Sequence, residues 1–122
     1  MMDFNDHKPI YLQIADLVGE RVLSGDWTEG NRIPSVRELG AELGVNPNTV
    51  VRSYEQLTRM DIIQNKRGIG FFICEGATKR LKTERRNQFL QEEAIDIFRK
   101  MVLLDISEQE LMEEFRKWTA KL

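Results

Sequence analysis

Cysteine and histidine are almost missing from this chain of 122 residues, which contains one of each. Cys74 has no partner for a disulfide within one chain and no neighbouring ligands for a cysteine-rich metal site. His7 stands alone in the N-terminal leader, where we expect a solvated side chain rather than a metal ligand or catalytic base. The sequence therefore predicts no disulfide, no metal site and no cofactor.

Nothing in the sequence approaches the roughly 18 consecutive apolar residues that a membrane span requires. The N-terminus, MMDFNDHKP, has neither the basic start nor the apolar core of a signal peptide. At 41% hydrophobic and 31% charged residues, the composition suits one globular domain with a modest appendage, or two very small units. We expect a cytoplasmic protein without a membrane partner.

The residue combinations that catalysis needs are also missing. The chain shows no nucleophile with a base, no phosphate-binding loop and no metal-ligand spacing. Glu92, Glu93 and Asp96 are explained by a solvated helix face, and RGIG is too short for a nucleotide fingerprint. We predict that the chain is not an enzyme.

The net charge of -2 argues against a protein that coats nucleic acid indiscriminately, because such binding depends on neutralising many phosphates. Residues 1–76 hold 8 Lys or Arg against 11 Asp or Glu, and residues 77–122 hold 10 against 9. Any recognition of nucleic acid must therefore depend on the local placement of basic residues.

Three helices are predicted in the first half. Residues Pro9 to Leu23 carry an apolar stripe at helical spacing, and the loop that follows supplies Trp27 and Ile33 to the core. Ser35 and Glu38 match a capping box at the start of a helix over 36–43. Gly44 ends that helix, and Asn46 with Pro47 starts the next almost at once, so the two helices must cross. The inward face of the second is Val50, Tyr54 and Leu57.

Two strands, 62–64 and 69–73, are predicted to follow, joined by a turn over Asn65, Lys66, Arg67 and Gly68. Helix, turn, helix and glycine-tipped hairpin in this order describe a winged helix-turn-helix. The fold class is therefore α+β, mainly α, with a winged domain over 1–76 and a helical segment over 77–122.

The second of the crossed helices carries side chains suited to base edges in the major groove. Asparagine pairs with adenine, arginine with guanine, and the threonine methyl contacts the thymine methyl. Asn48, Thr49 and Arg52 supply these three types, with Ser53 beside them. Helix amides near Ser35, the Arg37 side chain and the basic hairpin tip are placed to contact phosphates. The alternative is that residues 46–49 only cap the helix, and that Arg52 pairs with Glu55 or Gln56 along it.

The segments PSVREL, LGVNPNTV and RGIGFFI resemble the GntR superfamily of bacterial transcription regulators, and NPNTVVRSYEQL with a short C-terminal segment is most similar to the YtrA-like subfamily. The resemblance covers about residues 9–74 and implies DNA contacts from Arg37, from the turn over 46–52 and from the hairpin tip. Pro47 replaces a basic residue of many relatives, and Asp61 replaces a common glycine. The full predicted DNA-binding set is Ser35, Arg37, Asn46, Pro47, Asn48, Thr49, Arg52, Ser53, Lys66, Arg67 and Gly68.

Residues 77–122 are predicted to form one long helix from about Thr78, then a final helix opened by a capping box at Ser107 and Glu110. The apolar side chains exceed what two helices hide between themselves, which predicts a two-fold dimer. Folding back onto the winged domain as a monomer is the alternative. The predicted interface is Phe89, Ile95, Phe98, Met101, Val102, Leu111, Phe115 and Trp118.

A basic strip over 79–86, KRLKTERR, is either a solvated helix face or a second phosphate contact, through Lys79, Arg80 and Lys82. Taken together, the sequence predicts a dimeric repressor of an inverted-repeat DNA operator, and similarity to the YtrA-like subfamily suggests a transporter operon. An effector is not identified. The other function class is a protein interaction module whose winged helix no longer binds DNA, which the acidic surplus in residues 1–76 favours.

Overall fold

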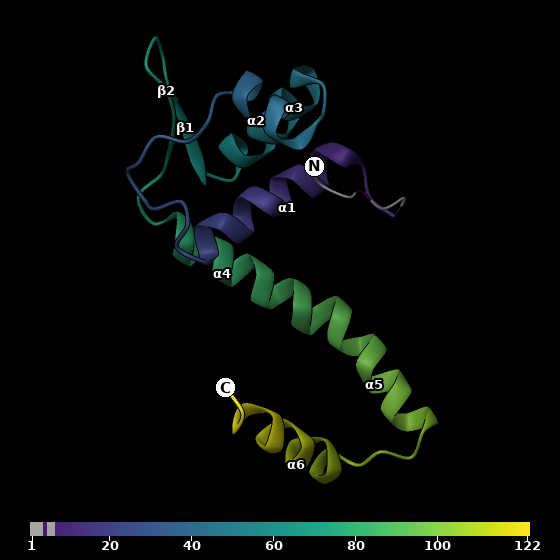
Figure 1. The fold of residues 1–122 in the computed structure, drawn as a ribbon. Coiled ribbons are helices and arrows are strands. Elements are labelled where there is room, and N and C mark those ends of the chain that lie inside the picture. Colours follow the sequence, from purple (N-terminus) through teal and green to yellow (C-terminus); the bar gives the residue numbers. More distant parts are fainter. Residues whose placement is uncertain (1–3, 5–6) are drawn as a thin grey trace. The chain divides into compact units, whose positions relative to one another are not determined.

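The computed structural model describes Phe4 and residues 7–122, and most of the N-terminal leader, on which the signal-peptide prediction was made, lies outside these residues. The chain divides into two compact units, Met1–Thr83 and Glu84–Leu122, and each is described by itself. The first unit contains three helices, a hairpin and the first turns of a fourth helix, and the second is helical, so the predicted α+β, mainly α class is confirmed (Figure 1).

The helices of the first unit begin and end close to the predicted residues. They are α1 (Ile10–Leu23), α2 (Val36–Leu43) and α3 (Pro47–Arg59). Pro9 is the N-cap of α1, where its ring restricts the backbone to the extended entry angle that is observed. Gly44 ends α2 at a φ of 72°, a left-handed conformation that favours glycine, and this allows α3 to start within a few residues.

The hairpin pairs β1 (Ile63–Lys66) with β2 (Gly70–Ile73) in antiparallel register. The prediction of a turn over 65–68 is wrong, because Asn65 pairs with Phe71 and Lys66 with Gly70 inside the sheet. The loop is instead Arg67, Gly68 and Ile69, closed by the Ile69 amide, which donates to the Lys66 carbonyl at 2.8 Å. Cys74 follows β2 directly and donates its amide to the carbonyl of Ile62.

The core of the first unit lies between α1, the α2–α3 pair and the hairpin. Its most buried side chains come from every one of these elements and include Ile14, Val18, Leu39, Val50, Tyr54, Leu57, Ile62 and Ile73. Ile33 is buried in it and Trp27 packs half-buried against it, as predicted for the loop between α1 and α2. This core holds α3 by one face.

The remaining helices are α4 (Ala77–Gln88), a π-helical segment η1 (Phe89–Glu93), α5 (Ala94–Leu103) and α6 (Glu108–Thr119). The predicted single long helix therefore contains a π-helical segment, in which the Ala94 amide donates to the Phe89 carbonyl five residues earlier. Ala77 and Leu81 are buried in the core of the first unit, so the first turns of α4 belong to that unit. The dimerisation role assigned to residues 77–122 stays a prediction.

Within Phe4 and residues 7–122, no helix combines the length and the apolar character needed to cross a membrane.

Candidate nucleic-acid interface

The crossing of α2 and α3 depends on two caps and one glycine. The Ser35 hydroxyl accepts from the Glu38 amide while the Glu38 carboxylate accepts from the Ser35 amide, both at 3.1 Å, so the predicted capping box is confirmed. These hydrogen bonds, the Ser35 amide foremost, hold the pKa of Glu38 below its ordinary value. At Gly40 a Cβ atom would lie 3.0 Å from the Val45 carbonyl oxygen, so a larger residue would require the turn to shift away from α2.

The start of α3 is capped by Asn46, whose side-chain oxygen accepts from the Asn48 amide at 2.8 Å, with Pro47 in the first turn. Asn46, Pro47 and Asn48 are all exposed. Only the amide oxygen of Asn46 is used by the cap, and the Asn48 side chain is directed to solvent. Capping and availability for base contacts are therefore compatible at this turn.

The inner face of α3 is fixed to the core by Val50, Tyr54 and Leu57, each at most 1% exposed. The Tyr54 hydroxyl donates to the Pro34 carbonyl at 2.6 Å, and its ring meets Phe71 of β2 edge-on at 4.8 Å. Burial raises the pKa of Tyr54, so the hydroxyl stays protonated and remains a donor at physiological pH. Through these contacts α3 is fixed relative to both α2 and the hairpin.

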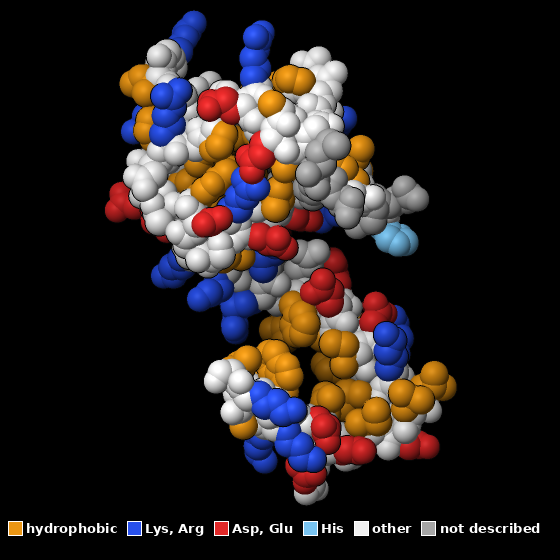
Figure 2. All heavy atoms as spheres, in the orientation of Figure 1, with side chains coloured by type: hydrophobic (Ala, Val, Ile, Leu, Met, Phe, Trp, Pro, Cys, Tyr) orange, Lys and Arg blue, Asp and Glu red, His pale blue; other side chains and the backbone are white. Residues whose placement is uncertain are grey.

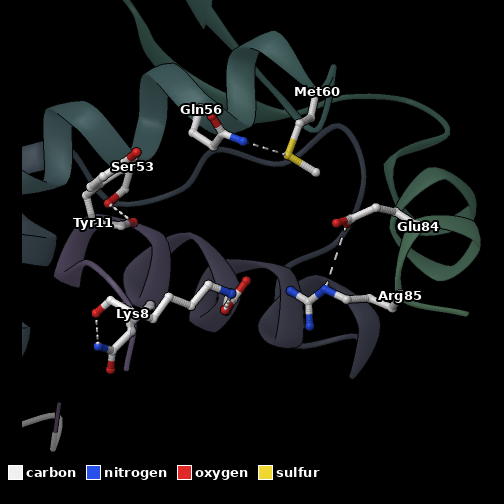
Figure 3. Close-up of polar contacts among 9 residues, drawn as sticks. Lys8, Tyr11, Ser53, Gln56, Met60, Glu84 and Arg85 are labelled. Atoms are coloured by element: carbon white, nitrogen blue, oxygen red, sulfur yellow. Dashed lines mark hydrogen bonds and ion pairs between the residues drawn. The ribbon is translucent and has the colours of Figure 1, made fainter. Parts of the chain in front are cut away.

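The prediction that Ser53 faces outward is wrong. Its side chain is fully buried, and its hydroxyl donates to the Tyr11 carbonyl of α1 at 2.6 Å and to the Thr49 carbonyl at 3.2 Å (Figure 3). Ser53 lies on the side of α3 that packs against α1, so it joins two helices and is not available to DNA. Thr49, one turn earlier on the same side, is half-buried.

Arg52 is exposed, but it does not pair with Glu55 or Gln56 as the alternative reading supposed. Its guanidinium carbon lies 4.1 Å from the ring centroid of Tyr11, at the start of α1. Gln56 instead accepts from Arg59 at 2.9 Å. Sequence periodicity along one helix cannot reveal the Tyr11 contact, because it joins two helices.

Val51 is a residue of the exposed face that the sequence analysis did not assign. Its side chain is 36% exposed and lines an apolar groove of about 480 Å³ between α2, α3 and the hairpin. The signal was present, because Val51 is rotated about 100° from the buried Val50 in a helix with 3.6 residues per turn. Asn48, Val51 and Arg52 thus form an exposed surface on the first half of α3.

Other basic side chains of this unit include Arg37 and those of the hairpin tip. Arg37 is exposed on α2, and Arg67 and Gly68 form the exposed hairpin tip, with Gly68 at a φ of 78°. The tip and the α2–α3 pair lie at the same end of the first unit in Figure 1, and Lys and Arg side chains project from this end in Figure 2. The Lys66 ammonium lies 4.3 Å from the Phe72 ring centroid.

Arg80, in the basic strip over 79–86, has a structural role. Arg80 donates to the Asp61 carbonyl through Nε at 3.0 Å and Nη2 at 2.6 Å, and to the Glu75 carbonyl at 2.8 Å. Asp61 itself has a φ of 59°, a left-handed conformation that glycine adopts more readily. Arg80 is therefore engaged by the backbone beside the hairpin, while Lys79 and Lys82 stay exposed.

The second unit exposes its apolar side chains. Of the predicted interface residues, Met101 is half-buried and the others are exposed, from 37% at Leu111 to 80% at Val102. Ala94 is the buried hydrophobic residue of this unit in the part of the chain that the structure describes. Figure 2 shows hydrophobic side chains gathered on this unit.

Comparison with known proteins identifies three kinds of likeness. The family model described as "Bacterial regulatory proteins, gntR family" matches residues 10–73. The uncharacterized HTH-type transcriptional regulator YhcF of Bacillus subtilis (strain 168) is 34% identical over 116 residues, which are 95% of this chain and 94% of that protein. The HTH-type transcriptional repressor YtrA of the same organism is 42% identical over 76 residues, covering 62% of this chain and 58% of YtrA. The crystal structure of a putative GntR-family transcriptional regulator from Bacteroides thetaiotaomicron is 43% identical, with a TM-score of 0.79 over 93% of this chain and 98% of that one.

Proposed function

The chain belongs to the GntR family of bacterial regulatory proteins, and from this premise we propose that it acts as a dimeric repressor that binds an inverted-repeat operator. It is a transcriptional regulator with a DNA-binding domain, and regulators of this family bind DNA and are not enzymes. The proposal concerns which residues read the operator, how many chains bind, and the effect on transcription.

One observation carries the proposal: α3 is buried along Val50, Tyr54 and Leu57 and exposes Asn48, Val51 and Arg52 in its first half. A docked helix-turn-helix meets base edges with the first turns of its second helix. The three exposed side chains match adenine, the thymine methyl and guanine respectively. We assign base reading to this surface, with Asn46, Pro47 and the half-buried Thr49 at its edge.

Phosphate contacts are proposed for the basic residues that flank this surface. Arg37 and the amides at the start of α2 lie beside α3, and Lys66, Arg67 and Gly68 provide the hairpin tip. Such contacts position the protein without selecting a sequence. Because these contacts are few and the winged unit has an acidic surplus, we expect one unit alone to bind DNA weakly.

A second copy of the chain adds a second set of DNA contacts. The exposed Phe98, Val102 and Trp118 of the second unit suit a shared interface, and two winged units related by a two-fold axis read half-sites about one or more helical turns apart. The relative YtrA is named as a repressor, which favours repression by occupying a promoter. Likeness to the YtrA-like subfamily supports a transporter operon as the target.

A mobility shift with the DNA upstream of the chain's own gene tests the proposal. We expect a discrete complex that contains two chains per duplex at moderate salt. Arg52→Ala should weaken it roughly 5- to 150-fold, the range for a bidentate guanine contact, while the unfolding temperature changes little because the residue is exposed. Arg99→Ala is the matched control, since Arg99 pairs with Asp96 at 3.0 Å in the second unit.

If no complex forms in the mobility-shift assay, the second candidate function, a protein interaction module, is favoured. The 11 acidic against 8 basic residues in residues 1–76 suit a winged unit that binds protein instead of DNA. A parent chain that gives no discrete complex with upstream DNA or with a randomised duplex library would refute the repressor and leave the interaction module.

A further inference from the structure

The contact between Arg52 and Tyr11 places a cation over an aromatic face beside the proposed base-reading surface. The guanidinium carbon is 4.1 Å from the ring centroid, well within the roughly 6 Å over which the negative face of a ring attracts a cation. Arg52 comes from α3 and Tyr11 from α1. The contact therefore gives α1, which carries no predicted DNA contact, a role at the interface.

The Tyr11 backbone beneath that contact is held in place by packing between the two helices. Its carbonyl accepts from the buried Ser53 hydroxyl at 2.6 Å (Figure 3), and α1 and α3 share the core through Ile14, Val18 and Val50. Near the start of α1, the Gln13 side chain donates to the Lys8 carbonyl at 2.7 Å. The Tyr11 ring thus extends from a fixed part of the first unit.

The Arg52 guanidinium keeps its hydrogen-bonding capacity. Across Phe4 and residues 7–122 none of its N–H groups meets an acceptor, and the nearby Glu55 carboxylate is not paired with it. An arginine has five N–H donors in a planar fork and loses much rotamer freedom when it binds. A ring that restricts the guanidinium before binding reduces the entropy lost on binding, and it does so without occupying an N–H donor.

We propose that Tyr11 is a positioning residue for base recognition, whose ring orients the Arg52 guanidinium to donate to the N7 and O6 atoms of a guanine in each half-site. The inference rests on the proposed operator binding by α3. An unrestrained arginine at this position reaches phosphates as readily as bases, and phosphates carry no sequence information. Loss of the ring should therefore reduce the preference for guanine more than it reduces total affinity.

The test uses a duplex that the parent chain selects from a randomised library, with each half-site guanine replaced in turn by 7-deazaguanine, which lacks the N7 acceptor. For the parent we expect one guanine per half-site whose replacement weakens binding. Arg52→Ala should abolish this penalty, and Tyr11→Leu should reduce it roughly two- to fivefold, the range for an exposed cation–π contact. Tyr11→Phe, which keeps the ring, should retain it.

Two controls separate positioning from folding. Thermal unfolding of Tyr11→Leu establishes that the variant is folded at the assay temperature. Arg67→Ala should weaken binding to every duplex while leaving the 7-deazaguanine penalty unchanged.

An NMR measurement on the free chain tests the contact itself. The Arg52 Nε–H resonance should carry a ring-current shift in the parent and in Tyr11→Phe and lose it in Tyr11→Leu.

The results distinguish this inference from the proposed function. A parent that selects an operator, with a Tyr11→Leu variant that keeps the full penalty, overturns the role of Tyr11 alone. An Arg52 resonance without a ring-current shift in the parent does the same. A parent that selects no duplex refutes the proposed function, and the positioning role with it, even where the ring-current shift is present.

Discussion

Neighbouring residues on α3 differ in whether their side chains are available for binding. Arg52 is exposed and stacked on Tyr11, whereas Ser53 is fully buried and donates to the Tyr11 carbonyl. The same holds at Arg80, which is committed to the Asp61 and Glu75 carbonyls, beside an exposed Lys79. Residue type suggests a chemistry, but the neighbouring elements decide whether it is available.

Ser53→Ala should lower the free energy of unfolding by about 1 kcal/mol, because it removes a hydrogen bond between α1 and α3. It should leave the preference among operator base pairs unchanged. Denaturant unfolding and competition binding measure the two effects. Thr58→Ala is the control, since the Thr58 hydroxyl donates to the Tyr54 carbonyl on the exposed side of the helix. A changed base preference in Ser53→Ala would return this residue to the DNA-binding surface.

At the scale of elements, the type and order of the helices and of the hairpin were predictable, while the hairpin loop was not. Caps and breakers such as Ser35, Gly44 and Pro47 act within a few residues, so sequence spacing predicts them. The loop depends on pairing across the sheet, where Lys66 meets Gly70 and shortens the turn. The Tyr11–Arg52 contact is likewise nonlocal, and no periodicity along one helix reveals it.

Arg67→Ala should weaken binding to all duplexes alike and reduce the slope of log affinity against log salt by about one per hairpin, as expected for the loss of a phosphate contact. We expect this phosphate contact because Arg67 is exposed in the loop between β1 and β2. Titrations at several salt concentrations measure the slope, with Arg99→Ala alongside. An unchanged slope would remove the hairpin tip from the phosphate contacts, and a loss at one base pair alone would make it a base reader.

The start of α4 depends on a glutamate from the loop between α1 and α2. The Glu29 carboxylate accepts from the Gly76 amide at 2.6 Å and from the Thr78 amide at 3.1 Å. These hydrogen bonds, the one from Gly76 foremost, hold the pKa of Glu29 below its ordinary value. A lowered folded-state pKa stabilises the fold at pH values above the ordinary pKa, and this contribution is lost as the pH falls through the lowered, folded-state pKa.

Glu29→Gln should therefore destabilise the chain at pH 6 to 7, and its difference from the parent should shrink as the pH falls below about 4.3, the ordinary pKa of glutamate. Urea unfolding over this pH range measures the difference. Glu20→Gln, which makes the same substitution at an exposed position of α1, is the matched control. A difference that grows on acidification would contradict the lowered pKa.

For the whole molecule, the family was predictable from local motifs, whereas the dimerisation role of the second unit stays a prediction. Its apolar residues predicted helices at the correct places, and their exposed side chains are the basis of the proposed dimer. The boundary between the units also differs from the prediction, because Ala77 and Leu81 are buried with the first.

Phe98→Glu should raise the dissociation constant of the proposed dimer by about tenfold or more, because it would place a charge in the proposed apolar interface. Sedimentation velocity over a concentration series measures the change. Gln91→Glu, which adds the same charge at an exposed polar position, should sediment like the parent. An unchanged mass for Phe98→Glu would refute the assigned interface.

We propose that the exposed first half of α3 reads base edges. The most direct measurement is the ratio of affinities for the selected operator and for a scrambled duplex at one salt concentration, in the parent and in Asn48→Ala/Arg52→Ala. We expect a parent ratio of about a thousandfold or more that falls by roughly 5- to 150-fold for each lost contact, with affinity for the scrambled duplex little changed. Equal, weak binding of the parent to both duplexes, or a double variant with the parent's ratio, would contradict it.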